Sequence, residues 1–419
     1  MSYSSVKAIK AREILDSRGT PTVETKVWLS DDSFAIASVP SGGSLGKYEA
    51  VELRDGDPKR FDGLGVLRAV ENVNQVIAPK LLGLDPGQQA KIDQIMVELD
   101  GTREKSRLGA NAILSVSEAV CRAAARMRKI PLYRYVAELA GITSFKMPMP
   151  MFNLINGGKH GAGNLDFQEF HVIPLFAPSF ADALRTGEEI YQAAGKVLVR
   201  YGAVHSVGDE GGFAPNLFTN LDALEILMEA AKEEEKVFGK DIFLGLDVAA
   251  SHFYQNGKYQ IRDRTMPLSS GELVEFYRDL NQQYPLYLLE DPLEQDDWGS
   301  WAKLTSEMAG ILVVGDDLLV TNRERVERAI KEKACGSVLI KPNQVGTISE
   351  TLLVVKASRG AGWKIIVSHR SGETVDDYIA DFAVGVGADL VKFGAPARGE
   401  RVAKYNRLLE IELELKTNT

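Results

Sequence analysis

The sequence predicts an α/β protein in two parts, an N-terminal α+β domain followed by an eight-stranded α/β barrel. Three observations support this fold class. Strand-like patterns precede helical patterns in the first 140 residues, short apolar runs alternate with amphipathic segments in the rest, and six polar residues follow apolar runs at nearly regular steps. We divide the chain into residues 1–140 and 141–419, because Pro148 and Pro150 break the helical pattern between the two parts.

The N-terminal part begins with strands and continues with helices. Residues 5–29 and 34–40 alternate apolar and polar side chains, and Gly19-Thr20-Pro21 separates two of these stretches. This pattern predicts an antiparallel meander. Apolar residues then recur at helical spacing in three segments, 63–83, 88–101 and 111–130.

The second part shows the repeated pattern of a barrel. We expect eight strands, at 151–155, 167–174, 242–248, 286–290, 311–315, 337–341, 364–368 and 388–393. Amphipathic segments such as 221–239 and 272–284 lie between them. An open doubly wound sheet is the competing interpretation, but no Gly-rich dinucleotide or P-loop motif follows the early strands.

The six regularly spaced polar residues are Asp247, Glu290, Asp316, Lys341, Arg370 and Lys392. The steps between them are 43, 26, 25, 29 and 22 residues. One strand, one helix and two short loops need about that many residues, so we expect the six side chains to converge at the same end of successive βα units.

Composition limits the class of partner. The chain has 419 residues, of which 45% are hydrophobic and 26% charged, and its formal net charge is −9. This charge disfavours nucleic acid and membrane surfaces, so an anionic ligand would need a local cationic pocket. Cys121 and Cys335 form no CxxC pair, which excludes a cysteine zinc site and suits a reducing compartment. With no secretory signal and no membrane-spanning apolar stretch, we expect a cytoplasmic protein.

Three carboxylates at strand ends indicate a metal site. Asp247, Glu290 and Asp316 each end an apolar run, where an ionised carboxylate needs a cation, a basic partner or a raised pKa. One such residue alone would be better explained as a helix cap or a salt bridge. Three in register favour Mg²⁺ over Zn²⁺, because the candidate ligands are oxygens without His or Cys.

Two lysines at further strand ends are candidates for a base. A lysine near divalent cations loses affinity for its proton, so either Lys341 or Lys392 could remove a proton while the other holds substrate. The plainer alternative is that both lysines only neutralise the carboxylates.

Acidic and imidazole side chains lie in two glycine-rich loops. Asp209 and Glu210 precede two glycines, and one acid of such a pair can serve as a general acid; taken alone, a solvated acidic turn is the better interpretation. His160 and Gln168-Glu169 offer another imidazole and carboxylate between two expected strands.

Two more segments suit an anionic ligand. His369-Arg370-Ser371 presents an arginine fork and a hydroxyl at an expected helix N-terminus, although Ser371 and Glu373 would also suit plain helix capping. Residues 38–55 are rich in serine and glycine, which is typical of a lid or equally of a surface loop.

The motifs SGGSLG, NGGKH, QEF, GDEGGFAPN, LLEDP, VGDDLLVTN, LIKPNQVGT and SHRSGET stand in this order, and the chain resembles the enolase family along nearly its whole length. The resemblance implies a capping domain, with residues 38–55 as its lid, and a TIM-like barrel that starts with an antiparallel hairpin. It implies interconversion of 2-phosphoglycerate and phosphoenolpyruvate with release of water, two Mg²⁺ ions, and a homodimer or octamer.

The resemblance also assigns roles. It implies that Lys341 removes the C2 proton and that Glu210 helps the C3 hydroxyl leave. The ligands of the tighter metal would be Asp247, Glu290 and Asp316, and Ser44 in the lid would bind the second metal. Arg370 and Ser371 would contact phosphate, and the remaining substrate shell would be Lys392, His160, Gln168, Glu169 and His369, the last two also catalytic.

Some positions depart from the family pattern. Gly43 and Leu45 stand in the lid where Ala and Thr are usual, Lys159 replaces a small residue, and Phe393 replaces Thr. None removes a reactive group. The alternative functions are a paralogue acting on a related phosphorylated or phosphonate 2-hydroxy acid, and, from another class, a surface-binding protein.

Overall fold

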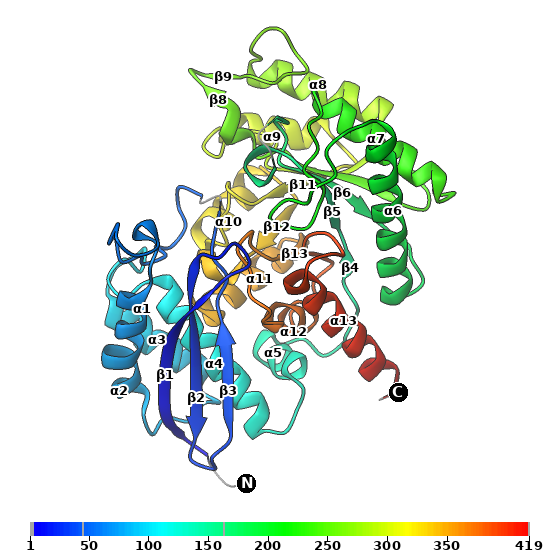
Figure 1. Ribbon diagram of the computed structural model, residues 1–419. Coiled ribbons are helices and arrows are strands. Elements are labelled where there is room, and N and C mark those ends of the chain that lie inside the picture. The colour runs from blue at the N-terminus through cyan, green and yellow to red at the C-terminus, as the bar shows by residue number, and fades with distance from the viewer. Residues whose placement is uncertain (1–3, 44–45, 162–163, 418–419) are drawn as a thin grey trace.

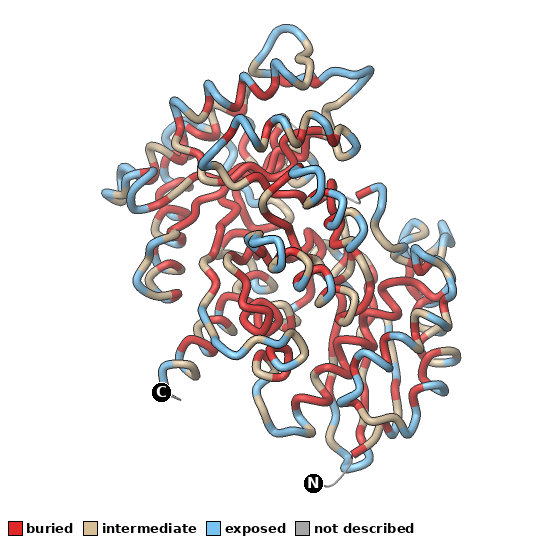
Figure 2. Tube along the Cα trace, turned by 180° about the vertical axis from the view of Figure 1, so that it is seen from behind, coloured by how far each residue is buried: buried red, intermediate tan, exposed pale blue. Residues whose placement is uncertain are grey.

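The computed structural model describes residues 4–43, 46–161 and 164–417. The N-terminal sheet and its helices lie at one end of the molecule, and the barrel with its surrounding helices forms the rest (Figure 1). The chain is buried through the strands and exposed along the outer helices and loops (Figure 2).

The N-terminal sheet is the predicted antiparallel meander. Its strands lie in the order β1 (Val6–Leu15), β2 (Pro21–Leu29) and β3 (Phe34–Ser38). Gly19, with φ +73°, allows the tight turn between β1 and β2. The helices that follow are α1 (Leu67–Glu71), α2 (Ala78–Leu81), α3 (Gln89–Asp100), α4 (Ala110–Met127) and α5 (Leu132–Ala140), and α4 packs against β2 and β3.

The barrel sheet closes on itself. Its order is β4-β14-β13-β12-β11-β10-β7-β6-β5. Only Met151 separates β4 from β5, so these two form one continuous strand of the barrel. Its β4 part pairs with β14 and its β5 part pairs with β6, so the closed barrel has eight strands. The strands are β4 (Met149–Pro150), β5 (Phe152–Asn156), β6 (Glu169–Ile173), β7 (Phe243–Asp247), β10 (Leu286–Glu290), β11 (Leu312–Gly315), β12 (Ser337–Ile340), β13 (Lys364–Ser368) and β14 (Leu390–Lys392).

The order of connections confirms the prediction of an α/β barrel with an atypical start. Strand β6 is antiparallel to both neighbours, and the remaining strands pair in parallel. The short hairpin β8 (Tyr254–Gln255) and β9 (Lys258–Tyr259) lies outside the barrel sheet. The helices are α6 (Phe180–Arg200), α7 (Asn220–Glu233), α8 (Ser270–Gln283), α9 (Trp298–Glu307), α10 (Arg323–Glu332), α11 (Ile348–Gly360), α12 (Tyr378–Gly385) and α13 (Gly399–Thr417).

The apolar core has two parts. A small cluster of seven buried residues fills the inside of the barrel, and a much larger cluster lies between strands and helices and extends under the N-terminal sheet. Cys121 and Cys335 are both buried, as expected. Among the described residues, no helix is long and apolar enough to cross a membrane.

Close packing of α6 on the barrel generates a testable prediction. A Cβ at Gly187 would lie 2.2 Å from Cε2 of the buried Phe152 ring, so we expect Gly187→Ala to destabilise the protein by about 1–3 kcal/mol. In α8, a Cβ at Gly271 would meet nothing within 4 Å, so Gly271→Ala should be neutral or stabilising by up to about 1 kcal/mol. Urea unfolding midpoints measure both changes, and equal midpoints would contradict the packing argument.

Candidate active site

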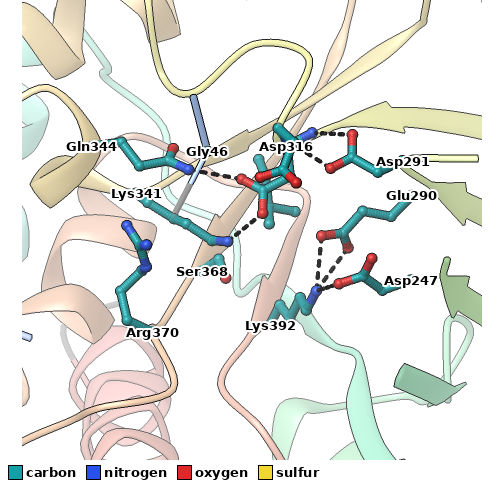
Figure 3. Close-up of polar contacts among 12 residues, drawn as sticks. Gly46, Asp247, Glu290, Asp291, Asp316, Lys341, Gln344, Ser368, Arg370 and Lys392 are labelled. Carbon is teal, nitrogen blue, oxygen red and sulfur yellow. Dashed lines mark hydrogen bonds and ion pairs between the residues drawn. The ribbon is translucent and has the colours of Figure 1, made fainter. Parts of the chain in front are cut away.

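The polar side chains share one mouth of the barrel because side chains on a strand repeat their direction every two residues. The inner apolar layer includes Leu288, Val314, Leu339, Ile366 and Leu390. Two residues further along the same strand directions stand Glu290, Asp316, Lys341, Ser368 and Lys392, which therefore face inward above that layer (Figure 3). Asp247 and Glu169 join them through the strand register, since Asp247 pairs with Glu290 on one side and with Glu169 on the other.

Three buried carboxylates share the ammonium group of Lys392. Its Nζ lies 3.0 Å from Asp247 Oδ2 and 2.8 Å from both oxygens of Glu290 (Figure 3). It also lies 2.8 Å from Glu169 Oε2. Burial alone lowers the pKa of Lys392, but the three carboxylates raise it well above its ordinary value. Lys392 is therefore a permanent cation, which favours a binding role over a role as base.

Lys341 stands on the opposite side of the hollow, against Asp316. Its Nζ donates to Asp316 Oδ2, and Gln344 Nε2 donates to Asp316 Oδ1 at 2.9 Å. Burial lowers the pKa of Lys341, and the Asp316 charge more than offsets this and raises it. The Asp291 carboxylate accepts from the backbone N–H groups of Asp316 and Asp317 at 3.0 and 2.6 Å, which fixes the turn that carries Asp316.

Glu210 is buried rather than solvated. Its loop turns at Gly211, with φ +87°, and places the carboxylate 3.0 Å from Asn153 Nδ2, 3.4 Å from His160 Nδ1 and 3.4 Å from His369 Nε2. Burial and the nearby Glu169 raise its pKa, whereas the two imidazoles lower it, and the net effect is a pKa of about 2. The burial of Glu210 removes the alternative of a solvated acidic turn.

Glu169 contacts both Lys392 and His160, and His160 lies beside Glu210. His160 Nδ1 lies 3.0 Å from Glu169 Oε1, and His171 Nε2 lies 2.8 Å from Glu169 Oε2. Gln168 Nε2 donates to Asp247 Oδ2 at 3.2 Å. Gln168 and Glu169 thus both contact the group of charged residues at the strand ends.

The segment at Arg370 corrects one prediction. Ser371 does not begin a helix, because α12 starts only at Tyr378. Instead, Ser41 and Gly372 exchange backbone hydrogen bonds of 2.7 and 3.1 Å, which ties this segment to the N-terminal part. The Ser371 hydroxyl accepts from Arg18 Nη1 at 3.3 Å.

A loop carboxylate holds Arg370. Nη1 and Nη2 donate to the two oxygens of Glu49 at 2.8 and 3.2 Å, and Nη1 also donates to Asn343 Oδ1 at 3.0 Å. Glu49 belongs to the predicted lid 38–55, and its neighbour Tyr48 donates to Asp296 at 2.8 Å. The expected second-metal ligand Ser44, and Leu45, lie outside the described residues.

The residues present fit a bound cation. Six carboxylates line the hollow, against three basic side chains, Lys341, Lys392 and Arg370. Asp247 Oδ1 is buried and accepts no hydrogen bond within the described ranges. Burial and the Asp247 charge raise the pKa of Glu290 well above its ordinary value, although the charge of Lys392 lowers it.

The ligand oxygens do not form one tight group. Asp247 and Glu290 share Lys392, whereas Asp316 faces Lys341. In the part of the chain that the structure describes, two groups offer ligand atoms within 4.8 Å of one another: Asp291, Asp316 and Asp317, and His160, Glu169 and Glu210. A cation between Asp247, Glu290 and Asp316 would have to replace contacts that the lysines now make.

Most predicted residues meet at this hollow. Its lining includes Lys341, Glu210, Glu169, His369, His160, Gln168, Arg370, Ser371, Lys392, Asp247 and Asp316, with Glu290 fully buried beside Lys392. Phe393 is absent from the described lining because its ring is buried near Tyr405, 6.1 Å between centroids. The side chain of Lys159 is exposed. The structure thus gives little support to Phe393 as a determinant of substrate choice.

Sequence reasoning missed several residues of the site. Asp291 and Asp317 directly follow the predicted ligands Glu290 and Asp316 and line the hollow. The pairs of adjacent acidic residues in the sequence could have indicated them. No motif in the sequence pointed to Arg18, Glu49 or Arg401. Arg18 and Glu49 contact residues more than 300 positions away, and Arg401 contacts His369 from a different element of the fold.

Comparisons with known proteins agree with these features. Residues 6–136 match the family described as Enolase, N-terminal domain, and residues 144–419 match Enolase, C-terminal TIM barrel domain. Over 412 residues the chain is 50% identical to the protein named Enolase 1 of Methylococcus capsulatus (strain Bath), which spans 98% of this chain and 97% of that protein.

The Glu49 contact yields a prediction about anion binding. Replacing Glu49 by Gln removes the carboxylate that neutralises the buried Arg370 guanidinium, so we expect inorganic phosphate to bind about tenfold more tightly. Titration calorimetry with phosphate measures this. Asp296→Asn is the matched control, because it disturbs the same loop through Lys47 and Tyr48 without contacting Arg370. Unchanged or weaker phosphate binding by Glu49→Gln would show that Glu49 does not compete with anions.

Proposed function

Because this chain belongs to the enolase family, it is a phosphopyruvate hydratase, and we propose that Lys341 and Glu210 are the base and the acid of its reaction. The enzyme interconverts 2-phospho-D-glycerate and phosphoenolpyruvate with release of water, a reaction of glycolysis. The observation that carries the assignment is the placement of Lys341 and Glu210 in the lining of one hollow, from different segments of the barrel.

Lys341 suits the role of base better than Lys392. Lys392 is held by three carboxylates and keeps its proton, whereas Lys341 pairs, among the described residues, with the single carboxylate of Asp316. A neutral amine at Lys341 would accept the C2 proton. The family uses a divalent metal, and we propose two Mg²⁺ ions, one held by Asp247, Glu290 and Asp316 and the other with help from Ser44. When bound, the ions would supply positive charge that favours proton loss from both Lys341 and the substrate.

Glu210 needs a proton to act as an acid. In the structure its carboxylate is ionised, because His160 and His369 hold its pKa at about 2 against burial and Glu169. A phosphate and a carboxylate on the substrate bring negative charge into the same hollow, and this raises the pKa of Glu210. The proton then goes to the departing C3 hydroxyl.

The remaining side chains bind and orient the substrate. Arg370 and Ser371 would hold the phosphate, with Arg370 exchanging its contact with Glu49 for the ligand. The shell would be completed by Lys392, His160, Gln168, Glu169 and His369. We propose that His369, directly, and Glu169, through His160, hold Glu210 in place. The buried positions of these groups exclude bulk water and strengthen each charge interaction.

We also propose that residues 1–140 act as a capping domain whose loop 38–55 closes over the barrel, and that the enzyme is a cytoplasmic homo-oligomer, a dimer or an octamer. The lid proposal rests on the contacts of Tyr48 and Glu49 with the barrel. Sedimentation velocity tests the oligomer, and a monomer at micromolar concentration would refute it.

Two variants should separate the two proton transfers. We expect Lys341→Ala to lose at least about 10³-fold in kcat and to stop exchange of the C2 proton with D₂O. Glu210→Gln should lose at least about 10²-fold in kcat but retain C2 exchange, because its base is intact. Lys364→Ala is the control, since Lys364 lies at the opposite end of β13 and pairs with Asp389. Loss of exchange in Glu210→Gln with exchange intact in Lys341→Ala would reverse the assignment.

Metal removal provides a separate prediction. We expect chelation to abolish activity, Mg²⁺ to restore it, and titration calorimetry to resolve two sites per chain. Glu290→Gln should weaken the tighter site at least about tenfold, because it removes one buried negative ligand. A single Mg²⁺ site in the wild-type enzyme with substrate present would refute the second ion.

A further inference from the structure

One arginine from the last helix holds the turn that follows β13. Arg401, in α13, is fully buried, and its Nη1 lies 2.7 Å from His369 Nδ1 and 2.6 Å from the carbonyl of Arg370. Its Nη2 donates to the carbonyls of Ser371 at 2.6 Å and of Asp209 at 3.0 Å. Each of the four terminal N–H bonds thus has one acceptor, and the acceptors lie in the two loops that carry His369 and Glu210.

These contacts decide which ring nitrogen of His369 carries the proton. A guanidinium has only N–H donors and stays charged at every physiological pH, so the atom that it contacts must accept a hydrogen bond. His369 Nδ1 is therefore unprotonated. The ring proton is on Nε2, which lies 3.4 Å from Glu210 Oε2.

We propose that Arg401 is a positioning residue that keeps His369 neutral, with its single proton on Nε2 directed at Glu210. The proposal rests on the roles proposed above for Glu210 and His369. Arg401 touches neither substrate nor reacting atoms, and it acts through the imidazole. Its effect is to direct the N–H of His369 toward the Glu210 carboxylate, 3.4 Å away, and to prevent the ring from becoming a second acid.

The surroundings of the ring support this. Protonating Nδ1 would place an N–H against the N–H of Arg401 and bury two like charges 2.7 Å apart. Burial first, and the charge of Arg401 after it, lower the pKa of His369 against the opposing charge of Glu210. Gly394, with φ +85°, lets the ring fit tightly, because a Cβ there would lie 3.0 Å from His369 Cε1 and 3.2 Å from Arg401 Cδ.

Nitrogen NMR of the Mg²⁺-loaded enzyme tests the proposal directly. The chain has five histidines, so selective ¹⁵N-histidine labelling gives few signals, and His369→Gln assigns the one of interest. We expect His369 to show an unprotonated Nδ1 and a protonated Nε2 throughout pH 6 to 8. A protonated Nδ1, or an imidazolium at pH 7, would overturn the proposal. The NMR measurement does not depend on enzyme activity, so it can confirm or refute the tautomer even if the acid and base assignments are wrong.

Arg401→Lys is the informative variant, because it keeps a buried charge but cannot reach four acceptors. We expect its His369 to titrate near the ordinary pKa of about 6.5, so that kcat/KM between pH 8 and pH 6 falls about fourfold more than in wild type. Arg398→Lys is the matched control: Arg398 donates to the carbonyls of Gly208 and Ser17, and should leave the tautomer and the pH profile unchanged.

Three outcomes separate a positioning role from a merely structural one. If Arg401→Lys only lowers the unfolding temperature while the His369 tautomer and the pH profile stay as in wild type, the proposal is wrong. If Arg398→Lys shifts the profile equally, the effect belongs to the loop and the proposal is also wrong. If Arg401→Lys does not fold, the His369 tautomer measured in the wild-type enzyme decides whether the proposal is right.

Discussion

The structure depends on the balance of charge at one mouth of the barrel. Glu169, Asp247 and Glu290 lie at the ends of β6, β7 and β10, and all three contact the ammonium of Lys392, which reaches across from β14. Backbone pairing places these three carboxylates side by side. An ionised carboxylate buried without a partner is costly, so the lysine offsets the repulsion among them. The same excess of negative charge makes the hollow suited to cations. Stability and the proposed metal binding would thus depend on the same carboxylate oxygens.

Backbone strain collects beside these charged strand ends. Ala249, Asp291, Val320 and Thr321 have φ between +43° and +49°, and they follow β7, β10 and β11. Such conformations cost a non-glycine residue about 1–3 kcal/mol and persist only where surrounding contacts impose them. Here the contacts are visible: Asp291 accepts from two backbone N–H groups, and the Thr321 hydroxyl accepts from Lys341 N at 2.9 Å and donates to Gln344 at 2.7 Å. The strained turns therefore fix the direction in which the side chains of Asp316 and Lys341 enter the hollow.

The N-terminal part completes the anion side of the site. Arg18 contacts Ser371, and Glu49 holds Arg370, so residues before position 50 set the groups expected to bind phosphate. Arg122 of α4 pairs with Asp376, and the Ser38 N–H donates to the same carboxylate at 2.9 Å. The two parts are therefore joined by buried charge pairs at the loop after β13. The proposed closure of loop 38–55 and the proposed binding of phosphate would therefore involve the same residues.

The sequence by itself determined the architecture and most of the site. A side-chain period of two and a step of one βα unit placed Asp247, Glu290, Asp316, Lys341 and Lys392 at one mouth, because both rules are local and repeat along the chain. Only the tertiary structure decided which charges pair, since Lys392 contacts carboxylates from three different strands at once. It also replaced the expected helix start at Ser371 by a loop paired with Ser41, and it showed the roles of Glu49 and Arg401. These depend on contacts between residues that lie at least 30 positions apart in sequence, for which no local pattern exists.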